Sequence, residues 1–231
     1  MDRRTVLLVQ HGPGRGRIDG YLDRPLAHLE RRAPELRSRL RVHETGGDEP
    51  PGLDGVWAVV FFLADPLEEL YPACHREATE IARRARERGL RVLNPPGALS
   101  NSRKARQARL WRDAGLPTPP CRRVRSREDL LAAAGELGLP LVLRCDLEHA
   151  QRGLRLCRTR RELASIDPGG AWLTATPLVD VRATYRETDD GWRARVRQPD
   201  LWRRYHHKSR AYVVGGSVVP YHHFFSRRAA V

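Results

Sequence analysis

The chain has 231 residues, enough for one large or two small domains with their own hydrophobic cores. No run of residues approaches the roughly 18 apolar residues that a membrane-spanning helix needs. The apolar run at 5–9 is too short for a signal peptide. Length and hydropathy therefore argue against a membrane protein, and we expect a cytoplasmic one.

A net charge of +14 raises the question of polyanionic partners. Apart from Lys104 and Lys208, arginine carries this charge, and it is spread along segments that also contain acidic residues, such as 77–91. Solvated helix surfaces account for most of such a pattern. A basic module that binds nucleic acid is the alternative. The four cysteines have no CxxC spacing, which predicts reduced thiols.

The first 95 residues alternate between strand and helix signals. Continuous apolar runs are typical of buried parallel strands, and apolar residues at helical spacing indicate amphipathic helices. The alternation predicts a small doubly wound parallel α/β domain. The expected strands are 5–10, 41–43, 56–63 and 92–93, and the expected helices are 22–40, interrupted at Pro34, and 71–89.

Two loops of this domain are candidate ligand sites. The glycine-rich loop at 11–17 lacks the Gly-Lys-Ser/Thr ending of a P-loop and the spacing of a dinucleotide fingerprint, so an ordinary loop is the better interpretation. Asp65 follows the strand at 56–63, where open α/β sheets place their ligand crevice. For Asp65 we favour a role in a turn or helix cap.

A second set of signals begins at residue 91. A short strand ends in Asn94-Pro95-Pro96, and a basic helix over 100–114 carries Lys104. A turn at 116–120 and a strand at 122–124 follow. A helix then begins at a capping box formed by Ser126 and Asp129 and ends near Gly138. The last two signals are a strand at 141–144, which ends in Arg144, and a hairpin within 205–220 that turns at Gly215-Gly216.

This order resembles the ATP-grasp superfamily from residue 91 onward. Members show an Asn-Pro turn, a helix with a lysine, an "aGlPtPp" turn, a helix, an "hPhhhK" strand and a later hairpin, and here Arg144 replaces the lysine of the strand. The resemblance implies an α/β fold with α+β character in the second half. A pre-ATP-grasp-like domain would span 1–95, and an ATP-grasp-like nucleotide-binding domain would span 96–231.

The resemblance also implies a function. Its members are ligases that activate a carboxylate as an acylphosphate for attack by an amine or thiol. By position, Lys104 and Arg144 would hold the phosphates of ATP. Arg210 would be the catalytic residue, contacting the γ-phosphate or the acyl substrate, with Lys208 nearby. The implied partners are ATP and a small-molecule carboxylate, and the oligomeric state stays open, a homo-oligomer included.

Two further regions would contact the nucleotide in the family. The loop after Arg144 contains one glycine, and His149 and Arg152 would act there as charge partners of the phosphates. Strand and hinge residues at 171–180 would contact adenine. Asp180 or Asp146 would substitute for the acidic residue that family members use.

The family places its magnesium carboxylates after the hairpin, and the sequence shows no such pattern before Val231. We therefore expect ATP with Mg²⁺ as cofactor, without visible metal ligands, and nucleotide binding more firmly than turnover. A truncated enzyme, a binding module, a chain completed by a partner and an unstable remnant remain open. The pairs His206-His207 and His222-His223 could face each other across the hairpin, although a metal site there is the less favoured interpretation.

Overall fold

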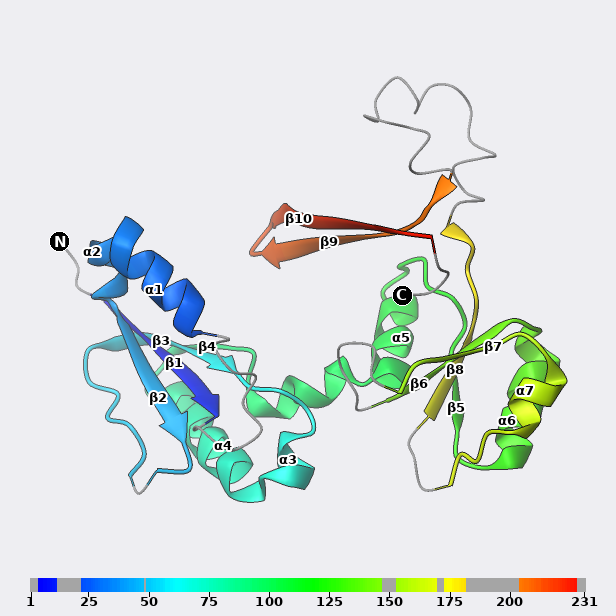
Figure 1. Ribbon diagram of the computed structural model, residues 1–231. Helices are drawn as coiled ribbons and strands as arrows, with labels where there is room; N and C mark the ends of the chain where they lie inside the picture. Colours follow the sequence, from blue (N-terminus) through cyan, green and yellow to red (C-terminus); the bar gives the residue numbers. More distant parts are fainter. Residues whose placement is uncertain are drawn as a thin grey trace. The chain divides into compact units, whose positions relative to one another are not determined.

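The computed structural model describes residues 4–11, 22–47, 49–146, 153–169, 173–181 and 204–227. The chain divides into two compact units, 1–107 and 108–231, and each is treated by itself below (Figure 1). Among the described residues, no helix has both the length and the apolar character needed to cross a membrane.

A four-stranded parallel sheet forms the centre of the first unit. Its strands lie in the order β2-β1-β3-β4, and every described pair in it is parallel. The strands are β1 (Thr5–His11), β2 (Leu40–Thr45), β3 (Val56–Phe62) and β4 (Arg91–Leu93). All four coincide with expected strands, so the parallel α/β prediction is confirmed.

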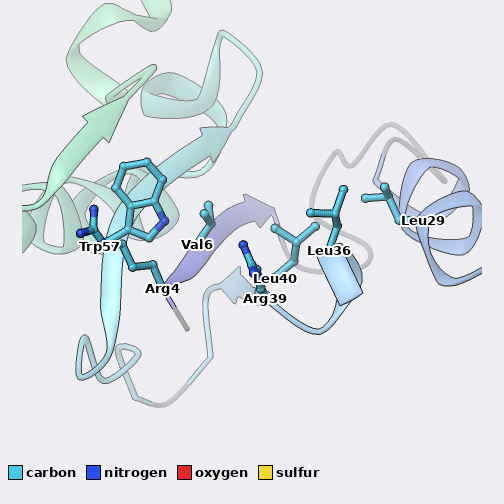
Figure 2. A pocket seen from close by; sticks show the side chains of 7 residues that line it. All are labelled: Arg4, Val6, Leu29, Leu36, Arg39, Leu40 and Trp57. Atoms are coloured by element: carbon cyan, nitrogen blue, oxygen red, sulfur yellow. The ribbon is translucent and has the colours of Figure 1, made fainter. Parts of the chain in front are cut away.

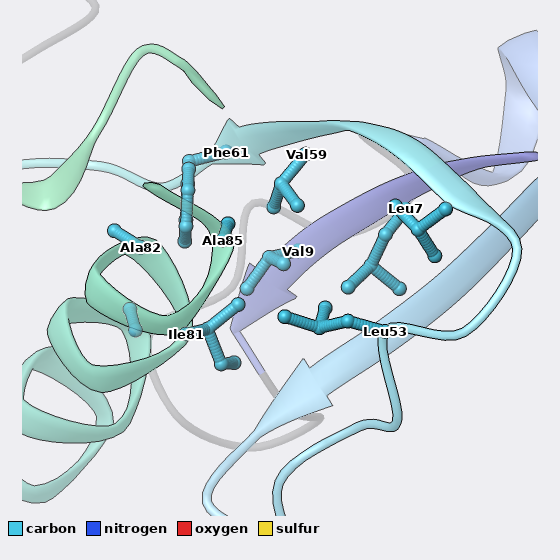
Figure 3. Close-up of a cluster of buried hydrophobic side chains, with 10 residues drawn as sticks. Leu7, Val9, Leu53, Val59, Phe61, Ile81, Ala82 and Ala85 are labelled. Carbon is cyan, nitrogen blue, oxygen red and sulfur yellow. The ribbon is translucent and has the colours of Figure 1, made fainter. Parts of the chain in front are cut away.

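Helices cover both faces of this sheet, as a doubly wound domain requires (Figure 1). The helices are α1 (Asp23–Arg32), α2 (Pro34–Arg37), α3 (Leu67–Leu70) and α4 (Pro72–Glu87). Pro34 begins α2, which confirms the expected interruption. On one face, Val9 and Val59 of the sheet pack against Ile81 and Ala85 of α4 (Figure 3). The apolar strands β1 and β3 and the amphipathic helix α4 thus account for most of the core.

The helix expected over 100–114 is divided in the structure. A 3-10 helix, η1 (Pro96–Ser102), precedes α5 (Lys104–Asp113). Between them, Arg103 has an extended backbone with φ −62° and ψ 129°. Its side chain pairs with Asp65, 38 residues earlier. A tertiary ion pair therefore interrupts a segment whose local sequence favours helix.

An antiparallel sheet in the order β5-β8-β6-β7 forms the centre of the second unit. Two helices pack on one of its faces, where Leu130 and Leu163 contact Leu141 and Leu143. The elements are β5 (Arg122–Val124), α6 (Arg127–Leu137), β6 (Leu141–Cys145), β7 (Arg155–Cys157), α7 (Arg160–Ala164) and β8 (Leu173–Pro177).

Side-chain caps begin both helices of this unit. Ser126 Oγ accepts the Asp129 N–H at 3.1 Å, and Thr159 Oγ1 accepts the Glu162 N–H at 3.2 Å. The Asp129 carboxylate in turn accepts the N–H of Arg125 at 2.9 Å, so the predicted capping pattern is present.

The expected hairpin consists of β9 (His206–Val214) and β10 (Ser217–Ser226). It turns at Gly215, whose φ of +58° suits glycine. The register pairs His206 with Ser226 and His222 with Arg210. The expectation that the two histidine pairs face each other is therefore wrong, because the turn position places them at different levels of the ladder. The sequence Thr-Asp-Asp-Gly at 188–191 is a further hairpin turn signal, and it lies outside the described residues.

Candidate functional site

The sheet of the second unit has a polar face opposite its two helices. Leu141 and Leu143 point into the core, so strand alternation directs Arg144 to the other face. Thr174 lies opposite Arg144 on the neighbouring strand, and Arg123 lies opposite Thr174 on the next one. Two cations thus flank a hydroxyl in one cross-strand row.

The backbone of Arg144 has a hydrogen-bond partner on the neighbouring strand, whereas its side-chain Nε has none among the described residues. Its carbonyl accepts a hydrogen bond from Thr174 Oγ1 at 3.2 Å. Its Nε is buried and has no hydrogen-bond partner in the part of the chain that the structure describes. A buried guanidinium N–H without a partner costs free energy. This N–H is therefore suited to donate to a ligand or to water.

Two further cations lie on one face of β9. Lys208 and Arg210 are two residues apart, so their side chains share that face. Burial lowers the pKa of Lys208 below its usual value of 10.5, and the neighbouring charges of Arg210 and Arg144 lower it further. The guanidinium carbon of Arg210 lies 5.3 Å from the centre of the Phe224 ring. Lys208, Arg210 and Arg144, called the cation cluster below, repel one another and favour an anionic ligand.

Sequence reasoning missed two residues beside the cluster. Arg123 occupies the row described above, and Cys121 precedes the same strand. Burial raises the pKa of the Cys121 thiol. Two nearby charges act on it with opposite sign: Arg144 lowers this pKa and Asp146 raises it. Asp146 is itself buried at the end of β6. The β5–β8 register brings Arg123 into line with Arg144, and no local motif encodes that register.

The other candidate residues are placed as follows. Lys104 is the first residue of α5 in the first unit, where its Nζ donates to the Ser102 carbonyl at 3.2 Å. Asp180 follows β8 and is half-buried. His149 and Arg152 lie outside the described residues. The structure places Lys208 within electrostatic reach of Arg210 and Arg144, and the roles of all these residues stay predictions.

Gly153, the single glycine of the loop after Arg144, has a structural reason for its presence. Its φ is +67°, and a Cβ at this position would lie 3.3 Å from the Cys145 Cβ. Both the backbone conformation and the close approach of β6 therefore require glycine.

Asp65 lies in the bend just before α3, whose N-cap residue is Pro66, and its contacts add an ion pair that the sequence did not predict. The carboxylate of Asp65 is buried and accepts two hydrogen bonds from Arg103, from Nε at 2.9 Å and from the terminal nitrogen at 3.2 Å. Glu69 contacts the same guanidinium. These carboxylates raise the pKa of Arg103 above its usual range. Asp65 is thus part of a buried ion pair that fixes the segment before α5.

Magnesium is the metal that the sequence leads us to expect beside ATP. The described residues contain no group of three or more His, Cys, Asp or Glu side chains that could hold a metal ion. The carboxylate oxygens that Mg²⁺ prefers are therefore not gathered in this part of the chain.

Solved structures with a similar fold are ATP-grasp enzymes. The structure aligns with carboxyaminoimidazole ribonucleotide synthase from Aspergillus clavatus complexed with ATP at a TM-score of 0.52 and 15% identity, covering 78% of this chain and 49% of that one. It aligns with ATP-grasp ligase PsnB complexed with minimal precursor, Mg and ADP at a TM-score of 0.50 and 18% identity, covering 78% and 64%. The chain therefore spans half to two thirds of these enzymes.

Comparison of sequences adds little to this result. No family model matches the chain. Over 61 residues it is 41% identical to uncharacterized protein y4rH of Sinorhizobium fredii, which is 26% of this chain and 13% of that protein. The solved structures thus show a shared fold, and this fold agrees with the motif order found from residue 91 onward.

Proposed function

Because the chain has the ATP-grasp fold, we propose that it binds ATP through the cation cluster and is related to ligases that join a carboxylate to an amine or thiol. The observation that carries this proposal is the buried Arg144 Nε, which has no hydrogen-bond partner in the described part of the chain and lies near the charges of Lys208 and Arg210. Neighbouring cations gain most from a polyanion such as a triphosphate.

Each cation of the cluster has a distinct role in this proposal. Arg144 supplies a planar fork for two phosphate oxygens and uses the buried Nε that lacks a partner among the described residues. Lys208 is a point donor beside it. Arg210 contacts the γ-phosphate or the acyl substrate, which makes it the proposed catalytic residue. Lys104 is the proposed second phosphate ligand, contributed by α5.

Adenine would bind at the end of β8. The Leu178 N–H already donates to the Pro140 carbonyl at 3.0 Å, which ties this hinge to the start of β6. The residues just beyond, Val179 and Asp180, are then the ones proposed to contact the base. His149 and Arg152 are proposed to act from the loop that would cover the phosphates.

The ligase reaction is proposed at the level of substrate class, a small-molecule carboxylate and an amine or thiol. The described residues do not gather ligands for Mg²⁺. No step is therefore assigned to this metal. The proposal makes nucleotide binding the property to test first, because the cluster alone supplies the charge for it.

Calorimetric titration of the folded protein with ATP, with and without Mg²⁺, tests the proposal. We expect saturable binding that falls at least tenfold in Arg144→Gln, which removes one charge-assisted contact. Lys104→Ala should weaken binding similarly. Arg155→Gln is the matched control, because Arg155 lies on the same sheet, is exposed and is aligned with the core residue Leu143.

Two results would contradict the proposal. The first is no binding heat from a protein that unfolds cooperatively, and the second is an equal loss of affinity in Arg155→Gln and Arg144→Gln. Binding to oligonucleotides that weakens steeply with salt and is indifferent to ATP would favour the nucleic-acid alternative instead. No described contact favours that alternative at present.

A further inference from the structure

The first unit contains a pocket that the ATP proposal does not use. Its volume is about 550 Å³. Its apolar wall is formed by Leu29 of α1, Leu36 of α2 and Leu40 at the start of β2 (Figure 2). The floor is Val6 at the beginning of β1. The pocket therefore lies at the amino ends of the strands, whereas open α/β sheets bind their usual ligands at the carboxyl ends.

A β-bulge places an aromatic ring in this pocket. Thr5 pairs with Val56, and Val6 pairs with Ala58, so Trp57 is an extra residue on β3. Val56 and Val59 both belong to the core beside α4, although regular alternation would put residues three apart on opposite faces. The bulge thus turns Trp57 away from that core. Bulges re-aim side chains in this way, and they are rare in parallel sheets.

Positive charge surrounds the indole. The guanidinium carbon of Arg4 lies 5.9 Å from the centre of the Trp57 ring, and that of Arg91 lies 5.3 Å from it. Arg39, at the mouth beside Leu40, makes no ion pair in the described part of the chain (Figure 2). The residues that line the pocket are apolar, aromatic or cationic, and none of them is acidic.

We propose that this pocket binds a small organic anion with a flat apolar body, of the aromatic carboxylate class. The leucines and the indole would bury the ring, and the guanidinium of Arg39, with that of Arg4, would face the carboxylate. The volume falls within the roughly 300–1,000 Å³ of small-molecule sites, which combine apolar walls with a few placed polar groups. The inference goes beyond the proposed ATP site and does not depend on it.

Titration with 2-naphthoate, followed by calorimetry, tests the proposal on the full chain. A dissociation constant on the order of 1 mM is expected for a ligand of this size. The neutral analogue 2-naphthalenemethanol should bind about tenfold more weakly, since it cannot form the charge-assisted contact. Arg39→Gln should weaken 2-naphthoate binding by about the same factor. The control Arg32→Gln removes an exposed charge from the end of α1, outside the pocket lining, and should have no effect.

A second variant separates loss of the site from loss of the fold. Leu36 is 47% exposed and lines the pocket, so Leu36→Trp fills the space without removing a charge. Binding should disappear while the urea midpoint of unfolding stays within experimental error. Three results would each overturn the proposal. They are unchanged binding in Leu36→Trp, equal affinity for the neutral analogue, and no binding of 2-naphthoate at a concentration about ten times the expected dissociation constant.

Discussion

The two units of this protein use their charged side chains in opposite ways. In the first, Arg103 is neutralised by Asp65 and Glu69, and Arg83 lies between Glu80 and Glu87. In the second, desolvation lowers the pKa of Lys208, and the neighbouring cations Arg210 and Arg144 lower it further. The same residue type therefore has different roles. Where carboxylates surround an arginine it holds the fold, and where other cations surround it the protein favours an anionic ligand.

This contrast depends on the face of the sheet as well as on the unit. Arg122 of β5 donates to Glu136 of α6 at 2.7 Å, on the face that carries the helices. Arg123, the next residue, lies on the opposite face in line with Arg144. Strand alternation thus places two consecutive arginines on opposite faces of the sheet, one paired with a helix and the other beside the cluster.

The largest expected effect is the loss of the buried ion pair. Asp65→Ala leaves Arg103 with Glu69 alone, and the side chain of Arg103 is only 17% exposed. Because the mostly buried guanidinium would lose both of its hydrogen bonds to Asp65, the free energy of unfolding should fall by about 3 kcal/mol. Urea denaturation followed by circular dichroism measures this change.

A surface pair supplies the control for that experiment. Asp54 is 97% exposed and pairs with Arg88 at 3.0 Å. Asp54→Ala should change the stability by less than about 1 kcal/mol. If both variants lost the same amount, the first unit would not depend on buried pairing, and the comparison between the units would fail.

The next effect concerns the cluster itself. Arg144→Glu replaces a cation beside the proposed phosphates with an anion, so ATP affinity should fall about a hundredfold, the equivalent of about 3 kcal/mol. Arg144→Lys keeps the charge but loses the planar fork, so its loss should be near tenfold or smaller. Calorimetry measures both affinities.

Arg155→Glu, which makes the same charge change on β7, should leave ATP binding within a factor of about two. A hundredfold loss in that variant would show that overall charge, rather than the cluster, controls binding.

Much of the fold could be predicted because its signals are local. The apolar runs at 5–10 and 56–63 became β1 and β3, and Ser126 with Asp129 began α6 as the capping pattern indicates. The motif order from residue 91 led to the fold that the structural comparisons support. The proposed roles of Arg144, Lys208 and Arg210 come from the same motifs and stay predictions.

Features that depend on long-range pairing could not be predicted in this way. The break before Lys104 follows from the contact between Arg103 and Asp65, and a basic helical sequence carries no sign of it. The bulge at Trp57 depends on the register of β1 with β3, so the pocket was not visible in the sequence. The sequence did allow one such prediction. The turn at Gly215-Gly216 fixes the register of the hairpin, and this register shows that the two histidine pairs are not opposite each other.

A smaller effect separates the fold of the second unit from its proposed site. Ser126→Ala removes the hydroxyl that accepts the Asp129 N–H, so the free energy of unfolding should fall by about 1 kcal/mol. ATP affinity should not change, because the cap lies on a helix that covers the core face. Ser126→Asn, which keeps an accepting oxygen, should restore the stability. Urea denaturation and calorimetry on the same samples measure the two quantities, and a parallel loss of ATP binding would contradict the separation.

The smallest effect is a pH dependence that originates in Lys208. In the free protein its pKa lies below 10.5, so the folded state releases this proton at a lower pH than the unfolded state does. The unfolded state then binds more protons, and stability should rise with pH between the lowered pKa and 10.5. ATP affinity should fall as the pH rises, because the phosphates favour the protonated amine.

The expected decrease in ATP affinity is about fivefold as the pH rises through the lowered pKa. Calorimetry across this range, repeated on Lys208→Arg, isolates the residue, since a guanidinium stays protonated and should remove the slope. A slope of the same size in Lys208→Arg would assign the titration to another group and would remove Lys208 from the cluster.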